Sequence, residues 1–133
     1  MKKIFILSIL LLIGLNANNY QDAQNGNPQS QYKLGLHYKN AQNKNLRESF
    51  RWMHKSALKG YTPAQYEFGL MFHYGIGVRQ NFELARLWFR RASRNGEPRA
   101  KSILYRFYAG KKVGGNDGKH RQYYTQNFRT IRR

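Results

Sequence analysis

The chain has 133 residues, enough for one compact domain, and its 24 Lys and Arg against 6 Asp and Glu give a formal net charge of +18 at pH 7. So few carboxylates disfavour a paired-carboxylate hydrolase or an oxygen-ligated calcium site, because either needs several acidic side chains to converge. The absence of cysteine excludes disulfides, thiolate zinc sites and thiol nucleophiles. With 41% hydrophobic residues the chain is too apolar for a disordered basic tail, so packing must hold a fold together.

The N-terminal region is expected to lie ahead of the folded domain. Residues 1–17 resemble a secretory signal, since two lysines precede an apolar run from Ile4 to Leu15 and Ala17 supplies a small residue for cleavage. An uncleaved anchor is the alternative, but about twelve residues span roughly 18 Å as a helix, against a hydrocarbon core of roughly 30 Å. Residues 18–27 are polar without apolar periodicity, which predicts a short leader. We expect a periplasmic or secreted protein.

A repeat of about 35 residues organises the rest of the chain. The segment Ser-Gln-Tyr-Lys-Leu-Gly-Leu at 30–36 recurs as Ala-Gln-Tyr-Glu-Phe-Gly-Leu at 64–70, and the segment 52–60 recurs at 88–96. A third copy begins at Pro98 and then fades. Four of its positions are equivalent to Ala64, Phe68, Met71 and Phe72, namely Ala100, Leu104, Phe107 and Tyr108.

Each copy is predicted to form two helices. Thr62 is a natural N-cap, Pro63 suits the first helical turn, and Gln65 completes a capping-box pattern. Second helices are predicted to end at Gly60 in the first copy and at Asn95-Gly96 in the second. Their apolar faces comprise Leu46, Phe50, Met53 and Ala57 in the first copy, and Phe82, Ala85, Trp88 or Phe89, and Ala92 in the second.

Two glycines recur inside the predicted first helices. Gly35 and Gly69 occupy equivalent positions, although glycine within a helix costs roughly 1 kcal/mol relative to alanine. We expect them to let the paired helix approach closely. The run Tyr74-Gly-Ile-Gly-Val78 is interpreted as the hairpin turn of the second copy, and not as a nucleotide-binding loop, since no strand precedes it and no third glycine follows.

These segments resemble the Sel-1-like repeats, which are relatives of tetratricopeptide repeats. The resemblance rests on Ala-Gln-Tyr-x-x-Gly-Leu at 64–70, the glycine loop at 74–78, Ala-x-x-Trp-Phe at 85–89 and the closing Asn95-Gly96. It implies an all-α fold, a short α/α solenoid of helical hairpins. The first copy departs from the pattern, because residues 39–43 replace the glycine loop and Ser49 and Ser56 replace small alanines.

The predicted organisation is a signal at 1–17, a leader at 18–27, repeats at 28–62 and 63–97, and a degenerate third repeat with a basic C-terminal helix at 98–133. Glycine is frequent between 110 and 118, which predicts a loop. From residue 119 onward, Tyr124, Phe128 and Ile131 follow helical spacing, so a terminal helix could close the stack.

The resemblance implies an enzymatic alternative, a β-lactamase or a peptidoglycan-related hydrolase, because some exported, cysteine-rich family members are described as β-lactamases or penicillin-binding proteins. Ser30 with Lys33 and Ser56 with Lys59 fit the Ser-x-x-Lys pattern. The companion Ser-Asp-Asn and Lys-Thr-Gly motifs are missing. Ser56 also falls where the repeat needs a small buried residue, and Ser30 lies near a helix start, so packing and capping are the favoured interpretation.

No cofactor or metal site is predicted. The histidines show no metal-ligand spacing and are expected to be exposed helix residues; they are His37, His54, His73 and His120. Trp52 and Trp88 recur at matched positions, so core packing is favoured over a ligand platform.

Function is predicted to depend on binding. The leading hypothesis is a non-enzymatic exported adaptor that binds an acidic protein on the surface lined by its first helices. The candidate contacts, interpreted as exposed, are Lys33, His37, Glu67, Met71 and Lys101.

The basic residues give a further hypothesis. They are dense from Arg79 to the C-terminus and interleave with aromatic residues. They form either a solvated basic face or a surface for anionic envelope polymers or lipid headgroups. Nucleic acid is disfavoured as the ligand of an exported protein. The candidate anion contacts are Arg121, Arg129, Arg132 and Arg133.

Overall fold

The regular secondary structure of the described residues is helical throughout. The computed structural model of the protein describes residues 18–42 and 44–109. The signal, the glycine-rich loop and the C-terminal helix predicted for 1–17 and 110–133 lie outside these ranges. A short helix over residues 18–24 precedes five longer ones. These are α2 (Pro28–Asn40), α3 (Leu46–Leu58), α4 (Thr62–Tyr74), α5 (Phe82–Arg94) and α6 (Pro98–Tyr108).

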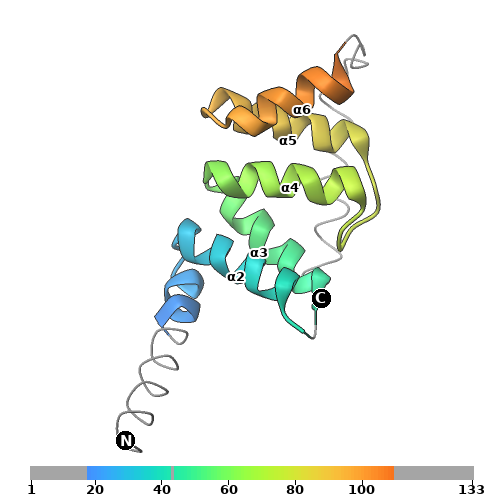
Figure 1. The fold of residues 1–133 in the computed structure, drawn as a ribbon. Coiled ribbons are helices and arrows are strands. Elements are labelled where there is room, and N and C mark those ends of the chain that lie inside the picture. The colour runs from blue at the N-terminus through green and yellow to red at the C-terminus, as the bar shows by residue number, and fades with distance from the viewer. Residues whose placement is uncertain (1–17, 43, 110–133) are drawn as a thin grey trace, which may run out of the picture.

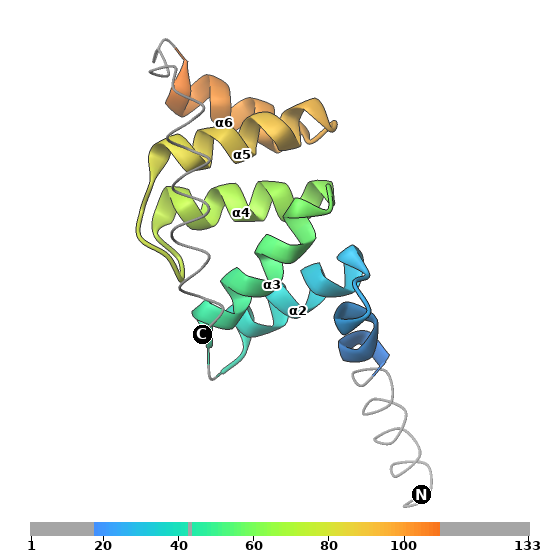
Figure 2. The ribbon, with the colours of Figure 1, turned by 180° about the vertical axis from the view of Figure 1, so that it is seen from behind.

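The helices form hairpins that stack in chain order (Figures 1 and 2). α2 packs on α3 and α4 packs on α5, while contacts of α3 with α4 and of α5 with α6 join successive hairpins. α6 is the first helix of the third copy and lies against α5 at the far end of the stack (Figure 1). The predicted all-α solenoid is therefore confirmed.

The recurring glycines lie where the two helices of each hairpin approach most closely. A Cβ atom on Gly35 would lie 2.8 Å from Cε of Met53, and one on Gly69 would lie 2.6 Å from Cε1 of Phe89. Both distances are too short for a side chain, so the predicted close approach is confirmed in both hairpins.

The glycine loop of the second repeat turns the chain between α4 and α5. Gly75 caps α4 with φ of 70° and Gly77 has φ of 69°, a left-handed region that favours glycine. A Cβ on Gly77 would collide with the carbonyl oxygen of Leu46 at the start of α3. This loop therefore joins the two hairpins as well as turning the chain.

Aromatic side chains fill the core between the hairpins. Trp88 is 0% exposed, and its ring centroid lies 4.9 Å from that of Phe68. Trp52 is 5% exposed and meets Tyr20 edge-on at 6.2 Å. Core packing of both tryptophans, predicted from their matched positions, is confirmed.

The start of α4 differs from the prediction. The N-cap is Tyr61, which makes no side-chain capping bond, so Thr62 is already helical. Gln65 does not complete a capping box. Its Nε2 donates to the carbonyl oxygen of Ala57 and its Oε1 accepts from Nδ2 of Asn95, so this amide ties α4 to the ends of α3 and α5.

Residues 18–26 are not the unstructured leader that their polarity predicts. Residues 18–24 are helical, and Ala23 is 0% exposed. Nε2 of Gln31 donates to the carbonyl oxygen of Ala23 at 3.0 Å, as Gln65 donates to Ala57 at 3.3 Å one repeat later. Gly26 and Gly60 end their segments with φ of 96° and 84°. The segment is thus the end of a second helix that packs ahead of the first repeat.

Candidate protein-binding surface

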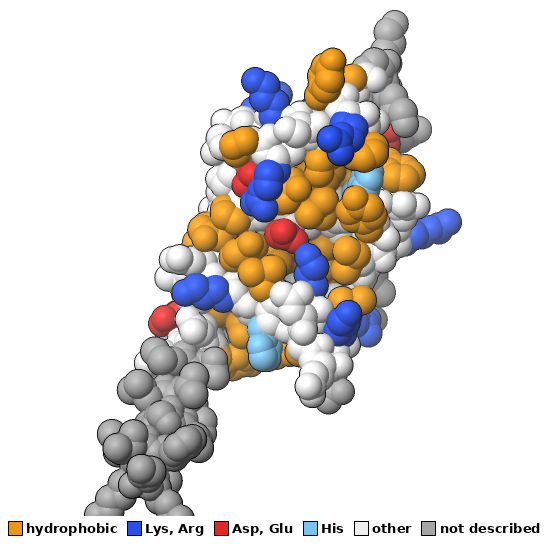
Figure 3. Space-filling view, viewed as in Figure 1, with side chains coloured by type: hydrophobic (Ala, Val, Ile, Leu, Met, Phe, Trp, Pro, Cys, Tyr) orange, Lys and Arg blue, Asp and Glu red, His pale blue; other side chains and the backbone are white. Residues whose placement is uncertain are grey.

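Contacts between successive first helices form one continuous surface, here called the first-helix face. Nζ of Lys39 on α2 lies 2.8 Å from Oε2 of Glu67 on α4. The guanidinium carbon of Arg99 on α6 lies 4.3 Å from the ring centroid of Tyr66 on α4. Figure 3 shows hydrophobic side chains gathered over the middle of the stack, with acidic and basic side chains set among them.

Tyrosines supply much of this surface. The rings of Tyr32 on α2 and Tyr61 at the start of α4 lie 5.3 Å apart. Burial raises the pKa of Tyr32 and of Tyr66, so both hydroxyl groups remain protonated at neutral pH. Tyr32 is partly exposed, whereas Tyr66 is only 8% exposed and its ring packs beneath the guanidinium of Arg99.

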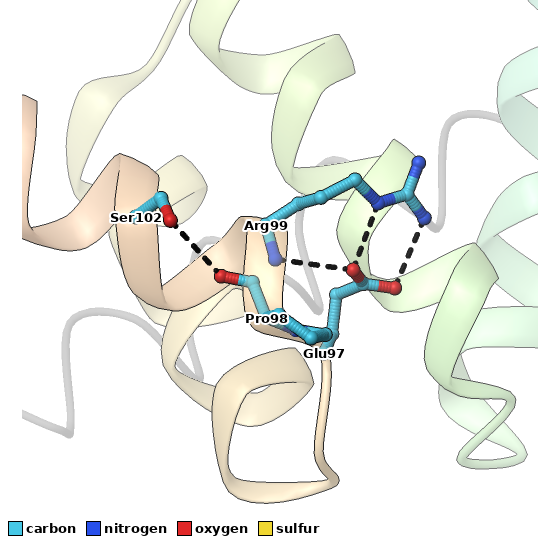
Figure 4. A network of polar contacts seen from close by, with 4 residues as sticks. All are labelled: Glu97, Pro98, Arg99 and Ser102. Carbon is cyan, nitrogen blue, oxygen red and sulfur yellow. Dashed lines mark hydrogen bonds and ion pairs between the residues drawn. The ribbon is translucent and has the colours of Figure 1, made fainter.

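Arg99 is held in one position by Glu97 (Figure 4). Nε of Arg99 donates to Oε1 of Glu97 at 2.8 Å and Nη2 donates to Oε2 at 3.0 Å, while the backbone N–H of Arg99 donates to Oε1 at 3.2 Å. These hydrogen bonds lower the pKa of Glu97 and raise that of Arg99. The Arg99 side chain is still 57% exposed, so a fixed guanidinium faces solvent.

The residues predicted to contact a partner differ in their exposure to solvent. Lys33, His37 and Lys101 are exposed. Glu67 is half-buried in its ion pair with Lys39. Lys101 occupies the position equivalent to Gln65, on the end of the stack. The prediction that Met71 is exposed was wrong.

Met71 is 0% exposed because it packs in the core. Its helical position is equivalent to that of His37, but the second repeat has neighbours on both sides and the first has fewer. The predicted anion contacts, Arg121, Arg129, Arg132 and Arg133, lie outside the described residues.

Sequence reasoning missed the tyrosines and the Arg99–Glu97 pair as surface features. The recurrence of Tyr32 and Tyr66 within the Gln-Tyr motif was visible, but it served only as evidence of the repeat. Arg99 was one of many basic residues, and only the fold places it over a ring of the preceding repeat.

Two of the histidines are not the exposed helix residues that were predicted. The ring of His54 stacks on Phe50 and Phe68 at 6.4 and 5.3 Å, and burial lowers its pKa to about 4. Nδ1 of His73 lies 2.6 Å from the hydroxyl oxygen of Tyr108. His37 is exposed as expected, and His120 lies outside the described residues. Within residues 18–42 and 44–109, no group of His, Asp and Glu is arranged to hold a metal ion.

The serines of the Ser-x-x-Lys matches have structural partners. The hydroxyl of Ser56 donates to the carbonyl oxygen of Pro28 at 2.6 Å, and Nζ of Lys59 donates to the carbonyl oxygen of Gly26. Ser30 is 5% exposed, and its backbone N–H donates to Oδ1 of Asn27 at the start of α2. Ser56 thus joins α3 to the start of α2 within the first repeat, Lys59 ties the repeat to the segment before it, and Ser30 lies in the N-terminal cap of α2. In the described part of the chain no helix has the length and apolarity to cross a membrane.

The model of the Sel1 repeat matches residues 28–61 and 62–97, which is more than half of the chain. The chain belongs to the Sel1 repeat family. Two solved structures support the fold of this Sel1 repeat protein. A Sel1 repeat protein from Oxalobacter formigenes is 34% identical with a TM-score of 0.63, covering 65% of this chain and 67% of that one. A protective antigen of uropathogenic Escherichia coli, with the same repeat fold, is 33% identical with a TM-score of 0.62, covering 68% and 20%.

Two curated relatives are much longer proteins. Chitin synthase regulatory factor 3 of Schizosaccharomyces pombe is 44% identical over 61 residues, covering 46% of this chain and 6% of that protein. An E3 ubiquitin-protein ligase component associated with protein degradation at the endoplasmic reticulum, HRD3A of Arabidopsis thaliana, is 36% identical over 63 residues, covering 47% and 9%. The chain therefore spans less than a tenth of either. Sel1 repeat proteins generally bind protein partners as scaffolds, and neither relative is named as a hydrolase.

Proposed function

We propose that this Sel1 repeat protein is an exported, non-enzymatic scaffold of the cell envelope that binds an acidic protein through its first-helix face. The observation that carries the proposal is the fixed, exposed guanidinium of Arg99 over Tyr66. Tyrosine and arginine are enriched where interfaces concentrate binding energy. A side chain that is already ordered loses less conformational entropy on binding.

The charge of the chain supports an acidic partner. Without residues 1–17, which include Lys2 and Lys3, the net charge is +16 (22 basic against 6 acidic side chains), and it attracts acidic proteins over long distances and repels basic ones. Two of the six carboxylates, those of Glu67 and Glu97, lie on the first-helix face, and each is already bound to a cation. Lys33 and His37 are exposed on α2 of the same face. The ammonium group of Lys33 is therefore available to pair with a carboxylate of the partner.

Export rests on the sequence of residues 1–17. Their basic start, apolar run and small residue at position 17 are typical of a secretory signal. Fractionation of cells that express the full chain, with N-terminal sequencing of the product, tests this part of the proposal. Periplasmic or secreted protein that begins near residue 18 is expected, and an intact N-terminus in the cytoplasm would contradict it.

Recovery of partners from envelope extract tests the binding role. Full-length protein is the bait at two salt concentrations, with Lys33→Glu as the test variant and Arg94→Glu as the control. Both residues are exposed, and both changes reverse one charge, but Arg94 ends the second helix α5. One acidic protein that depends on Lys33 and not on Arg94 is expected. If both variants recover equally less material, and if that recovery falls steeply with salt, the protein binds anionic polymer unspecifically instead.

A further inference from the structure

Exposed aromatic side chains surround His73 at the C-terminal end of α4. Tyr74 on α4, Phe82 on α5 and Phe107 on α6 are 62%, 49% and 45% exposed. Their ring centroids lie 4.7, 5.4 and 5.2 Å from that of His73. These four residues are here called the His73 patch. Single exposed apolar residues are ordinary, but a cluster contributed by three helices is typical of an interaction site. Figure 3 shows hydrophobic side chains gathered beside a histidine on this face of the stack.

The equivalent surface one repeat earlier is covered. Leu46 and Met71 stand 36 residues before Phe82 and Phe107, and Met71 is fully buried while Leu46 is half-buried. The cover comes from the loop that follows α4. Ile76 and Val78 of that loop pack against the core, and Gly77 lies against the backbone of Leu46. A repeat loop therefore closes this position where the stack continues.

The sequence after α6 lacks the residues that make this cover. The segment 36 residues beyond Gly75–Val78 reads Lys-Lys-Val-Gly, at 111–114. It places lysine and valine where Gly75 and Gly77 have positive φ, and valine is strongly disfavoured there. It places lysine and glycine where Ile76 and Val78 supply apolar side chains. The sequence of the repeat loop is therefore not repeated at 111–114.

Basic residues adjoin the His73 patch in the sequence. Arg79 precedes Gln80, whose Nε2 donates to the carbonyl oxygen of His73 at 2.7 Å, and Arg106 precedes Phe107; both arginines are exposed. Arg86 on α5 is only 9% exposed, and its Nη1 has no acceptor among the described residues. The carboxylate of Glu83 opposes these charges on α5. A second copy, which carries the same positive net charge, would be repelled.

We propose that the His73 patch is a second docking site, which binds an acidic segment of another protein. Apolar side chains of that segment cover Phe82 and Phe107, which are equivalent to Leu46 and Met71 one repeat earlier. Its carboxylates pair with Arg79 and Arg106. The inference rests on the proposed role as a protein-binding scaffold, but it concerns residues other than Lys33 and His37.

Site-specific photo-crosslinking of the full-length protein in cells of its native host tests this inference. Benzoylphenylalanine replaces Tyr74, and the crosslinked peptide is mapped by mass spectrometry. We expect one partner, attached through a peptide that carries both acidic and apolar residues. The crosslink yield should fall about tenfold or more with Phe82→Gln, because truncated hot-spot residues cost at least that much affinity. Arg79→Glu should also lower it, and Leu58→Gln, a change at an exposed apolar residue of α3, should leave it unchanged.

Several results would overturn the inference. These are a crosslink to residues 110–133 of the same chain, a crosslink to a second copy, a partner peptide without acidic residues, or a yield no higher than with the probe at position 58. Circular dichroism shows whether Phe82→Gln is folded, and the exposed change Arg79→Glu keeps the test valid if it is not. If recovery that depends on Lys33 persists while the probe at 74 captures nothing, this inference fails and the proposed function stands. If the Lys33-dependent recovery and the crosslink from position 74 are both absent, the proposed function and this inference are both wrong.

Discussion

Gly69 on α4 lies against the ring of Phe89 on α5, and a Cβ on Gly69 would come within 2.6, 2.7 and 3.2 Å of three ring carbons. The ring is itself held between Tyr66 and Tyr108, at 5.8 and 6.1 Å. It therefore has little freedom to move aside. This contact fixes how closely the two helices of the second hairpin pack.

We expect Gly69→Ala to destabilise the protein by about 1–3 kcal/mol, because overpacking outweighs the gain in helix propensity of roughly 1 kcal/mol. The matched change is Gly35→Ala. Its nearest neighbour is the flexible end of Met53, so a smaller loss is expected. Urea unfolding of both variants checks this, and equal stabilities would show that the ring of Phe89 yields as easily as methionine.

The hydroxyl of Ser56 should contribute to stability and not to catalysis. It donates to the carbonyl oxygen of Pro28 and is 0% exposed. Ser56→Ala leaves that acceptor without its partner, so a loss of about 1 kcal/mol is expected. Ser102→Ala, at an exposed hydroxyl that donates to the carbonyl oxygen of Pro98, is the control and should change stability by less. Thermal unfolding measures both. Hydrolysis of a chromogenic β-lactam that is lost in Ser56→Ala would contradict the structural role.

Stability should fall as the pH is lowered through the range in which His54 titrates. Burial lowers the pKa of His54 from 6.5 to about 4, so the unfolded chain binds a proton that the folded protein excludes. Stability is therefore full above pH 6.5 and decreases as the pH falls toward 4, by roughly 2–3 kcal/mol at about 1.4 kcal/mol per pKa unit. Burial lowers the pKa of His73 as well, which acts in the same direction.

Unfolding free energies of wild type and His54→Gln between pH 7 and 4 measure this effect. The variant should show a shallower pH dependence, whatever its stability at pH 7. If the unfolding free energies of wild type and variant change with pH at the same slope, His54 binds its proton equally well in the folded and unfolded chain.

The segment before the first repeat should be needed for stability. Ala23 is fully buried, and its carbonyl oxygen accepts from Gln31. Ala23→Leu should destabilise the protein by about 1–3 kcal/mol through overpacking. Gln24→Leu, at the exposed neighbouring position, is the control. If urea unfolding gives the two variants the same free energy of unfolding, residues 18–24 do not pack against α2 in solution.

Local sequence signals were sufficient to predict the repeat and its helical hairpins. Period, helical spacing and glycines at equivalent positions predicted α2 to α6, the turn at residues 74–78 and the buried tryptophans. They worked because helical spacing and glycine geometry are set within one repeat, although the turn and Trp52 also contact the neighbouring segment. The helix start at Thr62 was misplaced by one residue, since the amide of Gln65 binds a neighbouring helix instead of capping its own.

The sequence by itself determined the family, the solenoid architecture and the basic charge of this protein, because repeat period and composition do not depend on how hairpins are placed. Only the tertiary structure decided which residues face solvent. Met71 and His37 occupy equivalent positions, yet one is buried and the other exposed, because the number of neighbouring hairpins differs. The same stacking turns polar residues 18–26 into part of the fold and fixes Arg99 over Tyr66. Among the described residues it also leaves the aromatic rings of Tyr74, Phe82 and Phe107 exposed beside His73.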